Sequence, residues 1–376
     1  MTFKRAVVAF ESEERARARL ESFGYARDIA AEIAVYLAQS TDLPQFTDEI
    51  AKAFADAAAE VEFVSLDDLP ERLLELESER GTTIVWALTD GIRYYRGSAV
   101  PALARLQGFA RFGSPATAAH LCQDKFASLA LASASGLAVP ATRLLEGEVE
   151  IAALGSWPTR AGPVFIKPNT LGAKIGIFAD SLCETLGEAK ARAGRIWARY
   201  RDRALIQPFV AGDDVRVSFL DLGGPFSDQL GVERMIKDPF SETAGAFLTM
   251  KDNETLSGAK DTAGARGAFG QGKTAAFVPR MIDMREESDS RSRAAVAAIV
   301  DASVRLKRVA NLCDCFSLDF RVDPEGKPTF FEFEVCPAVT IYDFQNYLAR
   351  RGLALGPALV QAMRLAFERR RAMSEA

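Results

Sequence analysis

The sequence predicts an α/β protein of the α+β kind, organised in three domains, and three observations lead to that prediction. The chain has 376 residues, which corresponds to two or three domains of ordinary size. Its first 115 residues alternate strand-like apolar runs with charged runs of helical periodicity, a pattern typical of an open sheet covered by helices. The remainder carries short strand-like runs and ends in an amphipathic helix.

The first predicted domain spans residues 1–115. We expect three strands and two long helices in it: strands at Arg5–Phe10, Val61–Leu66 and Thr83–Leu88, and helices at 26–39 and 47–60. No Gly-x-Gly-x-x-Gly run follows any of these strands, so the dinucleotide fingerprint is absent where it would have to lie.

The second predicted domain spans residues 116–204. It begins directly after Ser114-Pro115, a helix cap followed by the proline that is common at a first helical position. A single helix is expected from there to Gly136, where glycine favours its end. The strand Val164–Pro168 and a glycine-containing turn follow.

The third predicted domain spans residues 205–376. We expect strands near 204–210, 215–220 and 231–236, and a terminal helix from Pro357 to about Arg371. Residues 255–273 contain five glycines with scattered lysines and arginines. This composition indicates either a mobile lid over a site or a disordered insertion.

The composition excludes several kinds of chemistry. There is one histidine, His120, so a Ser-His-Asp, Cys-His or His-ligated zinc mechanism would depend on a single imidazole. A net charge of −5 gives no broad basic footprint for nucleic acid or an anionic membrane, and no segment is apolar enough to span one. The five cysteines are odd in number and lack CxxC spacing, which is typical of reduced thiols in a cytoplasmic protein.

A carboxylate-rich hairpin is the most informative segment. Residues 316–335 have the pattern of two strands joined by a turn at 323–328. If the turn centres on its middle, Asp319 lies directly opposite Glu332, and strand alternation puts Glu334 on the same face. Three such carboxylates repel one another unless a cation lies among them, and oxygen ligands without His or Cys favour Mg²⁺ or Mn²⁺.

The phenylalanines of the second strand alternate with these carboxylates. Phe331 and Phe333 are therefore expected on the opposite face, against the core. An exposed acidic face above that core is the simpler alternative to a metal site.

A second segment adds a phosphate signal. Residues 167–177 leave a strand with a lysine and enter a turn of small residues whose amides can approach an anion. The order of residues is not that of a Walker A motif. Together with the later carboxylate hairpin, the turn predicts a site for a metal-bound polyphosphate.

Four separated motifs, in this order, resemble the ATP-grasp superfamily and, within it, D-alanine–D-alanine ligase. They are Phe165-Ile166-Lys167-Pro168-Asn169 with Gly172 and Gly176, then residues 206–214, then Asp319, then residues 332–337. The resemblance covers roughly residues 83–370 and is faint in the first 80. It implies an ATP-grasp fold preceded by an N-terminal open-sheet domain, and a homodimer formed through that domain.

The resemblance also implies how ATP and its metals are bound. Lys125 and Lys167 would contact the phosphates of ATP, and Lys251 would approach the phosphate that is transferred. The adenine would lie against a hinge formed by Gln207, Pro208, Phe209 and Val210, above the ring of Phe331. Asp214 would bind the ribose hydroxyl groups. Two divalent cations, Mg²⁺ or Mn²⁺, would be bound by Asp319, Glu332 and Glu334.

The substrate half of the sequence departs from that family. Ser317 stands where the family has an arginine that steadies the tetrahedral intermediate, and Arg321, Arg216 and Lys174 are the basic residues that could replace it. The family's His-Gly pair is Thr89-Asp90 here, and its serine pair is Ala173-Lys174.

Two further positions concern the substrates directly. Asp343 stands where the family uses a serine to hold the second substrate's carboxylate, and an aspartate there favours an amine or a guanidinium instead. Glu14 corresponds to the family's acidic contact with the first substrate's ammonium group.

These features predict an ATP-dependent carboxylate–amine ligase that forms an amide bond through an acyl phosphate, with small molecules other than two D-alanines as substrates. Phosphoryl transfer of this kind relies on positioning and on neutralising charge, so it needs no histidine. One alternative is D-alanine–D-alanine ligase itself. Another, of a different class, is a nucleotide-binding regulatory module that has lost catalysis.

Overall fold

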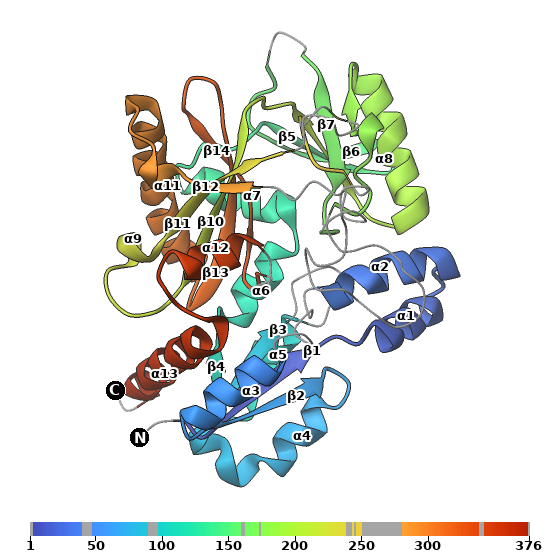
Figure 1. The fold of residues 1–376 in the computed structure, drawn as a ribbon. Helices are drawn as coiled ribbons and strands as arrows, with labels where there is room; N and C mark the ends of the chain where they lie inside the picture. The colour runs from blue at the N-terminus through green and yellow to red at the C-terminus, as the bar shows by residue number, and fades with distance from the viewer. Residues whose placement is uncertain are drawn as a thin grey trace, which may run out of the picture.

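The structure is a computed structural model. It describes residues 3–39, 47–88, 97–158, 162–172, 174–237, 243, 246–249, 280–337 and 342–374. The ribbon contains three sheets with helices packed on them, as Figure 1 shows. None of the helices in these ranges is long and apolar enough to cross a membrane.

The first sheet is parallel and has the strand order β2-β1-β3-β4. Its strands are β1 (Arg5–Phe10), β2 (Glu60–Ser65), β3 (Thr83–Leu88) and β4 (Ala110–Phe112). The three predicted strands are confirmed, with β2 one residue earlier than expected. All six residues of β3 are buried, because helices cover both faces of the sheet.

The helices of this region lie partly on a neighbouring sheet. They are α1 (Glu13–Ser22), α2 (Arg27–Gln39), α3 (Thr47–Asp56), α4 (Leu69–Glu75) and α5 (Ala99–Leu106), with a 3-10 turn at Glu77–Thr82. Buried side chains of α1 and α2, including Leu20 and Ile33, share one core cluster with Ile166 and Ile196 of the second sheet and its helix. The N-terminal segment therefore helps to build the core of the next part of the chain.

The second sheet has the order β6-β5-β9-β7-β8, with antiparallel pairings throughout. Its strands are β5 (Thr142–Glu146), β6 (Val149–Leu154), β7 (Val164–Pro168), β8 (Leu182–Cys183) and β9 (Ala204–Pro208). Helix α8 (Leu186–Tyr200) packs on it, as Figure 1 shows. Because β9 pairs with β5 and β7, the chain leaves this sheet only after Pro208.

The helix predicted between Ser114 and Gly136 is wrong as a single element. The structure has two helices, α6 (Ala116–Cys122) and α7 (Lys125–Ala134). Asp124 interrupts them because its backbone is extended and its carboxylate accepts a hydrogen bond from the Ala127 N–H at 2.9 Å, which caps α7.

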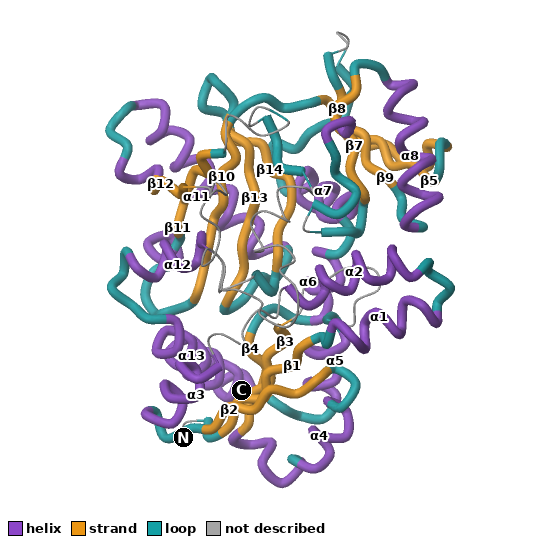
Figure 2. The backbone as a smooth tube through the Cα atoms, turned by 45° about the vertical axis from the view of Figure 1, so that its right-hand side comes forward, coloured by secondary structure: helices purple, strands orange, loops and turns teal. Residues whose placement is uncertain are grey.

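The third sheet is antiparallel, with the order β12-β11-β10-β13-β14, and Figure 2 shows these strands side by side. They are β10 (Asp213–Leu220), β11 (Gly231–Ile236), β12 (Arg280–Asp283), β13 (Cys315–Val322) and β14 (Pro328–Glu334). Helix α11 (Ser290–Val309) packs on one face, and the buried side chains of α7 join the same core. The opposite face is turned toward the second sheet.

The remaining helices are α9 (Phe226–Gln229), α12 (Tyr342–Ala349) and α13 (Leu355–Ser374), with 3-10 turns at Ala179–Ser181 and Met284–Glu286. Helix α13 extends the predicted terminal helix slightly at both ends. It packs on α3 and β4 of the first sheet, so the two ends of the chain share one core.

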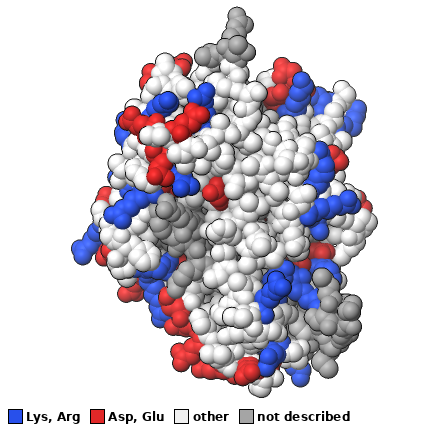
Figure 3. All heavy atoms as spheres, turned by 180° about the vertical axis from the view of Figure 1, so that it is seen from behind, with Lys and Arg blue, Asp and Glu red and all other residues white. Residues whose placement is uncertain are grey.

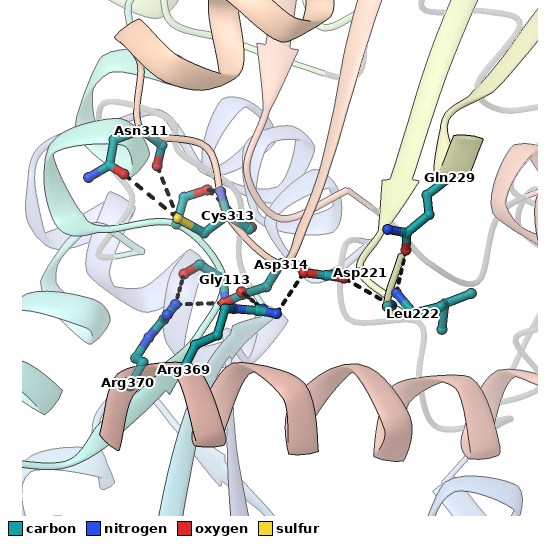
Figure 4. Close-up of polar contacts among 11 residues, drawn as sticks. Gly113, Asp221, Leu222, Gln229, Asn311, Cys313, Asp314, Arg369 and Arg370 are labelled. Atoms are coloured by element: carbon teal, nitrogen blue, oxygen red, sulfur yellow. Dashed lines mark hydrogen bonds and ion pairs between the residues drawn. The ribbon is translucent and has the colours of Figure 1, made fainter. Parts of the chain in front are cut away.

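An ion-pair cluster around Asp314 ties α13 to the loop before β13, as Figure 4 shows. The carboxylate of Asp314 is only 1% exposed and accepts from Arg369 at 2.7 Å, from Arg370 at 2.6 Å and from the Gly113 N–H at 2.8 Å. Arg369 also pairs with Asp221 at 2.8 Å. These arginines thus hold the ends of three segments together.

The surface carries charges of both signs. Acidic and basic side chains are interspersed on the face seen in Figure 3. This agrees with a chain whose 46 basic and 51 acidic residues nearly balance.

Candidate active site

A cavity of about 270 Å³ lies between the second and third sheets. Its polar lining comes from both sides and consists of Lys125, Lys167, Lys174, Gln207, Asp214, Arg216, Asp319, Arg321, Glu332 and Glu334. Most of the predicted nucleotide and metal residues therefore line one space, although they come from segments far apart in the sequence.

Two lysines enter the cavity from the second-sheet side. Lys167 lies on β7 and Lys125 begins α7, and the side chains are 9% exposed or less. Their backbones are joined at Asn169, whose carbonyl accepts from the Lys125 N–H at 3.2 Å and whose side-chain oxygen accepts from the Phe126 N–H at 2.9 Å. The strand end and the helix start are thereby fixed to each other, which holds both lysines in place.

The ammonium groups of these lysines have different surroundings. Lys125 donates to the Leu171 carbonyl at 2.8 Å and lies 3.5 Å from the Glu332 carboxylate. Lys167 lies 5.4 Å from the centre of the Phe331 ring. Burial lowers the pKa of Lys167, and the negative charge of Glu332 opposes that shift.

The hairpin register is confirmed at the site. Asp319 pairs with Glu332, and Ser317 pairs with Glu334, as the predicted turn centre requires. On the turn side of this pair the register shifts by one residue, because a β-bulge lies between the Asp319–Glu332 pair and the Phe320–Phe330 pair.

The bulge makes the predicted face of Phe331 wrong. Phe331 is the extra residue of the bulge and lines the cavity together with Glu332 and Glu334, while Phe330 and Phe333 are buried in the core. Simple alternation fails here because a bulge turns the following side chains relative to the regular strand. The ring remains available to the cavity, where the sequence resemblance put it.

An arginine side chain lies among the three carboxylates. Arg216 lies opposite Asp319 on β10 and binds both of its carboxylate oxygens, at 3.0 and 3.1 Å. The same guanidinium lies 3.2 Å from Glu334. Within the part of the chain that the structure describes, no three His, Cys, Asp or Glu side chains gather closely enough to hold a metal ion.

Glu332 is the most perturbed carboxyl of the site. Burial raises its pKa, but the positive charges of Lys125, Lys167 and Arg216 outweigh burial and lower the pKa to about 2. Glu332 is therefore ionised at any ordinary pH.

The predicted adenine hinge, residues 207–210, runs from β9 along the cavity wall. The Gln207 side chain is buried and donates to the Thr142 hydroxyl at 2.9 Å. The Phe209 N–H donates to the Pro163 carbonyl at 2.9 Å. Gly212 follows the hinge with φ +136°, and a Cβ there would lie 2.2 Å from the Val322 carbonyl oxygen, so only glycine lets the hinge pack on the hairpin.

Arg321, on β13, contacts this hinge through its side chain. It donates to Asp214 at 2.7 Å and to the Val210 carbonyl at 2.6 Å, and it also bonds the Ala246 carbonyl. Lys237, which the sequence did not bring to notice, binds the other oxygen of Asp214 at 3.0 Å. Burial raises the pKa of Asp214, but these two cations outweigh it and lower the pKa.

The structure describes only some of the residues that were predicted to contact the substrates. Lys174 lines the cavity with a left-handed backbone, φ 65°. Glu14 is exposed on α1 and is not part of the cavity lining, whereas Asp343 lies in α12. Lys251, Thr89, Asp90, Ala173, the Asp343 side chain and residues 255–273 lie outside what the structure describes.

Arg216 was named from the sequence only as one of three basic residues that could replace the family's arginine, and its contact with Asp319 was not predicted. One signal was available: Arg216 lies on the predicted strand 215–220, directly after the motif at residues 206–214. Its pairing with Asp319 depends on which strand becomes the neighbour of β13, and that is decided only by the fold.

Known proteins resemble the chain in sequence. A D-alanine–D-alanine ligase from Gloeobacter violaceus is 25% identical over 302 residues, covering 80% of this chain and 82% of the relative. The vancomycin B-type resistance protein VanB of Enterococcus faecalis is 24% identical over 276 residues, covering 72% and 69%. No family model matches the chain.

Solved structures resemble it in fold. A D-alanine–D-alanine ligase from Bacillus anthracis superposes with a TM-score of 0.63 at 13% identity, covering 98% of this chain and 99% of that one. The VanG D-Ala:D-Ser ligase of Enterococcus faecalis has a TM-score of 0.59 at 15% identity, covering 97% and 99%. The chain is thus a D-alanine–D-alanine ligase-like protein with the ATP-grasp fold.

Proposed function

We propose that this D-alanine–D-alanine ligase-like chain is an ATP-dependent ligase that joins a carboxylate to an amine through an acyl phosphate. One observation carries the proposal. Two buried lysines, one on β7 and one at the start of α7, and three carboxylates from the third sheet line the same cavity, beside a hinge built from a strand end. Polyphosphate binding requires cations held in place, and the lysines are fixed by their backbone contacts.

In this proposal ATP lies between the two sheets. The adenine contacts residues 207–210 and the Phe331 ring, the ribose lies toward Asp214, and the phosphates extend toward Lys125 and Lys167. The lysine at residue 251 approaches the transferred phosphoryl group. The neighbouring glycine-rich segment, residues 255–273, covers the site.

A divalent cation, Mg²⁺ or Mn²⁺, completes the site. The carboxylate oxygens of Asp319, Glu332 and Glu334 are of the type that such an ion prefers, but among the described residues these side chains do not surround a common point, so the nucleotide phosphates would have to supply further ligands. When bound, the ion would neutralise negative charge on the phosphates and hold them in line.

The chain's own groups would then act on charge and position. Lys125 and Lys167 neutralise the phosphoryl oxygens while the substrate carboxylate attacks the γ-phosphorus, so that the bond to ADP breaks and an acyl phosphate forms. The amine attacks the acyl carbon, loses its proton, and inorganic phosphate leaves with the bond electrons. Water must be excluded during this sequence because an acyl phosphate hydrolyses.

The substrates are proposed to be an amino acid or small peptide and an amine partner, rather than two D-alanines. Support comes from the positions at which the sequence departs from the resembling family: Ser317, Asp343, Ala173-Lys174 and Thr89-Asp90. D-alanine–D-alanine ligation is the second candidate, favoured by the names of the relatives. We also propose a cytoplasmic homodimer, a location that suits five free thiols.

The test is ADP release from ATP and Mg²⁺ with a panel of carboxylates that includes D-alanine, with hydroxylamine added to trap acyl phosphate as a hydroxamate. We expect at least one carboxylate to stimulate ADP release and to yield a hydroxamate. D-alanine as the best carboxylate and the best amine would select the second candidate.

Three variants complete the test. Asp319→Asn and Glu332→Gln should each lower turnover by about 100-fold or more, the size of losing one charged group at a phosphoryl-transfer site. Glu325→Gln is the matched control, because Glu325 is exposed in the turn of the same hairpin. Equal background turnover in all four proteins would indicate a non-catalytic nucleotide-binding module.

A further inference from the structure

Arg216 occupies the centre of the carboxylate face. Its Nε and Nη2 atoms bind the two oxygens of Asp319, and its Nη1 lies 3.2 Å from Glu334 Oε2. The side chain is 18% exposed, so the guanidinium lies at the cavity wall and is partly shielded from solvent. Such a forked contact is geometrically specific and stronger than a single ion pair.

The neighbouring residues direct the guanidinium to the hairpin. On the other side of β10, Arg216 lies opposite Glu233 of β11, and the buried carboxylate of Glu233 is bound by Arg350, which directly follows α12. On the hairpin side, Ser317 is small, and its hydroxyl lies 3.5 Å from Arg216 and donates to Glu334 at 3.2 Å. A long side chain at residue 317 would compete for this space.

Cations of the protein itself already contact most of the carboxylate oxygens of the site. Arg216 uses both oxygens of Asp319 and one of Glu334, and Lys125 lies nearest one oxygen of Glu332. A metal ion that bound Asp319 and Glu334 together would have to displace several charge-assisted hydrogen bonds. An ion that bound the other carboxylate oxygens of Glu332 and Glu334 would displace none of these hydrogen bonds.

We infer that Arg216 is a permanent cation of this site and takes the place of one of the two divalent ions that the family resemblance implies. The nucleotide complex then holds a single divalent ion per chain. The guanidinium stays bound to Asp319 and Glu334 and offsets one of their two negative charges whether or not a nucleotide is bound. This inference rests on the proposed function, because it assumes that the cavity binds a metal–nucleotide complex.

The experiment counts bound ions rather than activity. Mn²⁺ is titrated into the full chain saturated with a non-hydrolysable ATP analogue, and bound Mn²⁺ is measured by electron paramagnetic resonance and equilibrium dialysis. We expect one Mn²⁺ per chain for the wild type and two for Arg216→Gln, because the uncovered carboxylates then attract a second ion.

Two further variants make the result specific. Arg234→Gln is the matched control: Arg234 is on the adjacent strand and pairs with Asp213 and Glu287 at a different cavity, so one ion is expected. The double variant Arg216→Ser with Ser317→Arg moves the guanidinium to the position where the resembling family has its arginine, so two ions are expected. If Arg216→Gln does not fold, this double variant and Arg216→Lys still test the idea, because Arg216→Lys keeps a cation opposite Asp319 and should bind one ion.

The failures are distinguishable. Two ions in the wild type, or one ion in a folded Arg216→Gln, would overturn the inference and leave the ligase proposal standing. Two ions in Arg216→Lys, or one ion in the folded double variant, would also overturn it. A wild type that binds neither the nucleotide analogue nor Mn²⁺ would overturn the proposed function itself.

Discussion

Two aspartates five residues apart, Asp314 and Asp319, are each held by arginines from another element, yet they differ in what surrounds them. Asp314 is 1% exposed and its carboxylate is filled by two arginines and a backbone N–H, as in Figure 4. Asp319 is 26% exposed and faces a cavity. The same ion-pair chemistry thus forms a structural clamp in one place and a candidate binding site in the other.

The difference arises from packing. Asp314 precedes β13 at the point where the first sheet, α13 and the third sheet meet, so every approach to its oxygens is taken by protein. Asp319 lies in the middle of β13 on the face that lines the cavity, so its partners remain reachable from that space. Burial, rather than the identity of the partners, separates the two roles.

The largest expected effect is on stability. Asp314→Asn should lower the free energy of unfolding by about 3 kcal/mol, because it leaves Arg369 and Arg370 without their buried anion. Asp319→Asn should cost about 1 kcal/mol or less, because solvent reaches its partner. Urea denaturation measures both, and affinity for ATP should fall only in the second variant. Equal losses of stability would contradict the comparison.

A pH dependence gives a second, smaller test. Because the folded-state pKa of Glu332 is about 2, below its ordinary value of 4.5, its charge stabilises the fold above about pH 4.5. That contribution is lost as the pH falls from about 4.5 toward about 2. As the pH falls through this window, the unfolding free energy of the wild type should therefore decrease relative to that of Glu332→Gln. A difference that stays constant with pH would contradict the lowered pKa.

The smallest effect on stability is expected at an ion pair that is exposed to solvent and lies outside the cavity. Arg203 and Glu146 lie 3.2 Å apart and are 44% and 43% exposed. Arg203→Gln should change the unfolding free energy by less than about 0.5 kcal/mol, and its melting curve should overlay that of the wild type. A loss as large as that of Asp314→Asn would mean that exposure does not rank these ion pairs.

Much of the local structure could be predicted from the sequence. The strands Arg5–Phe10 and Thr83–Leu88 are observed with the predicted ends, and Asp319 lies opposite Glu332 as the turn position requires. These features depend on alternation and turn chemistry, which act over a few residues. The helix break at Asp124 was missed, although a capping aspartate is itself a local signal.

The bulge at Phe331 could not be predicted from the alternation of residues along the strand. Alternation predicts that Phe331 and Phe333 share a face, whereas the structure buries Phe333 and turns Phe331 to the cavity. A bulge is set by how two paired strands fit the core beneath them, so the pattern of one strand does not reveal it.

The sequence by itself determined which groups this protein has for chemistry: carboxylates alternating along one strand, a lysine at the start of a small-residue turn, a second lysine within a predicted helix, and a single histidine. Only the tertiary structure decided which of them meet. Arg216 reaches Asp319 because β10 and β13 are neighbours in the sheet, and Asp314 is a clamp because α13 returns to the first sheet. Contacts between segments about a hundred residues apart depend on the packing of whole elements, and no local pattern encodes that packing.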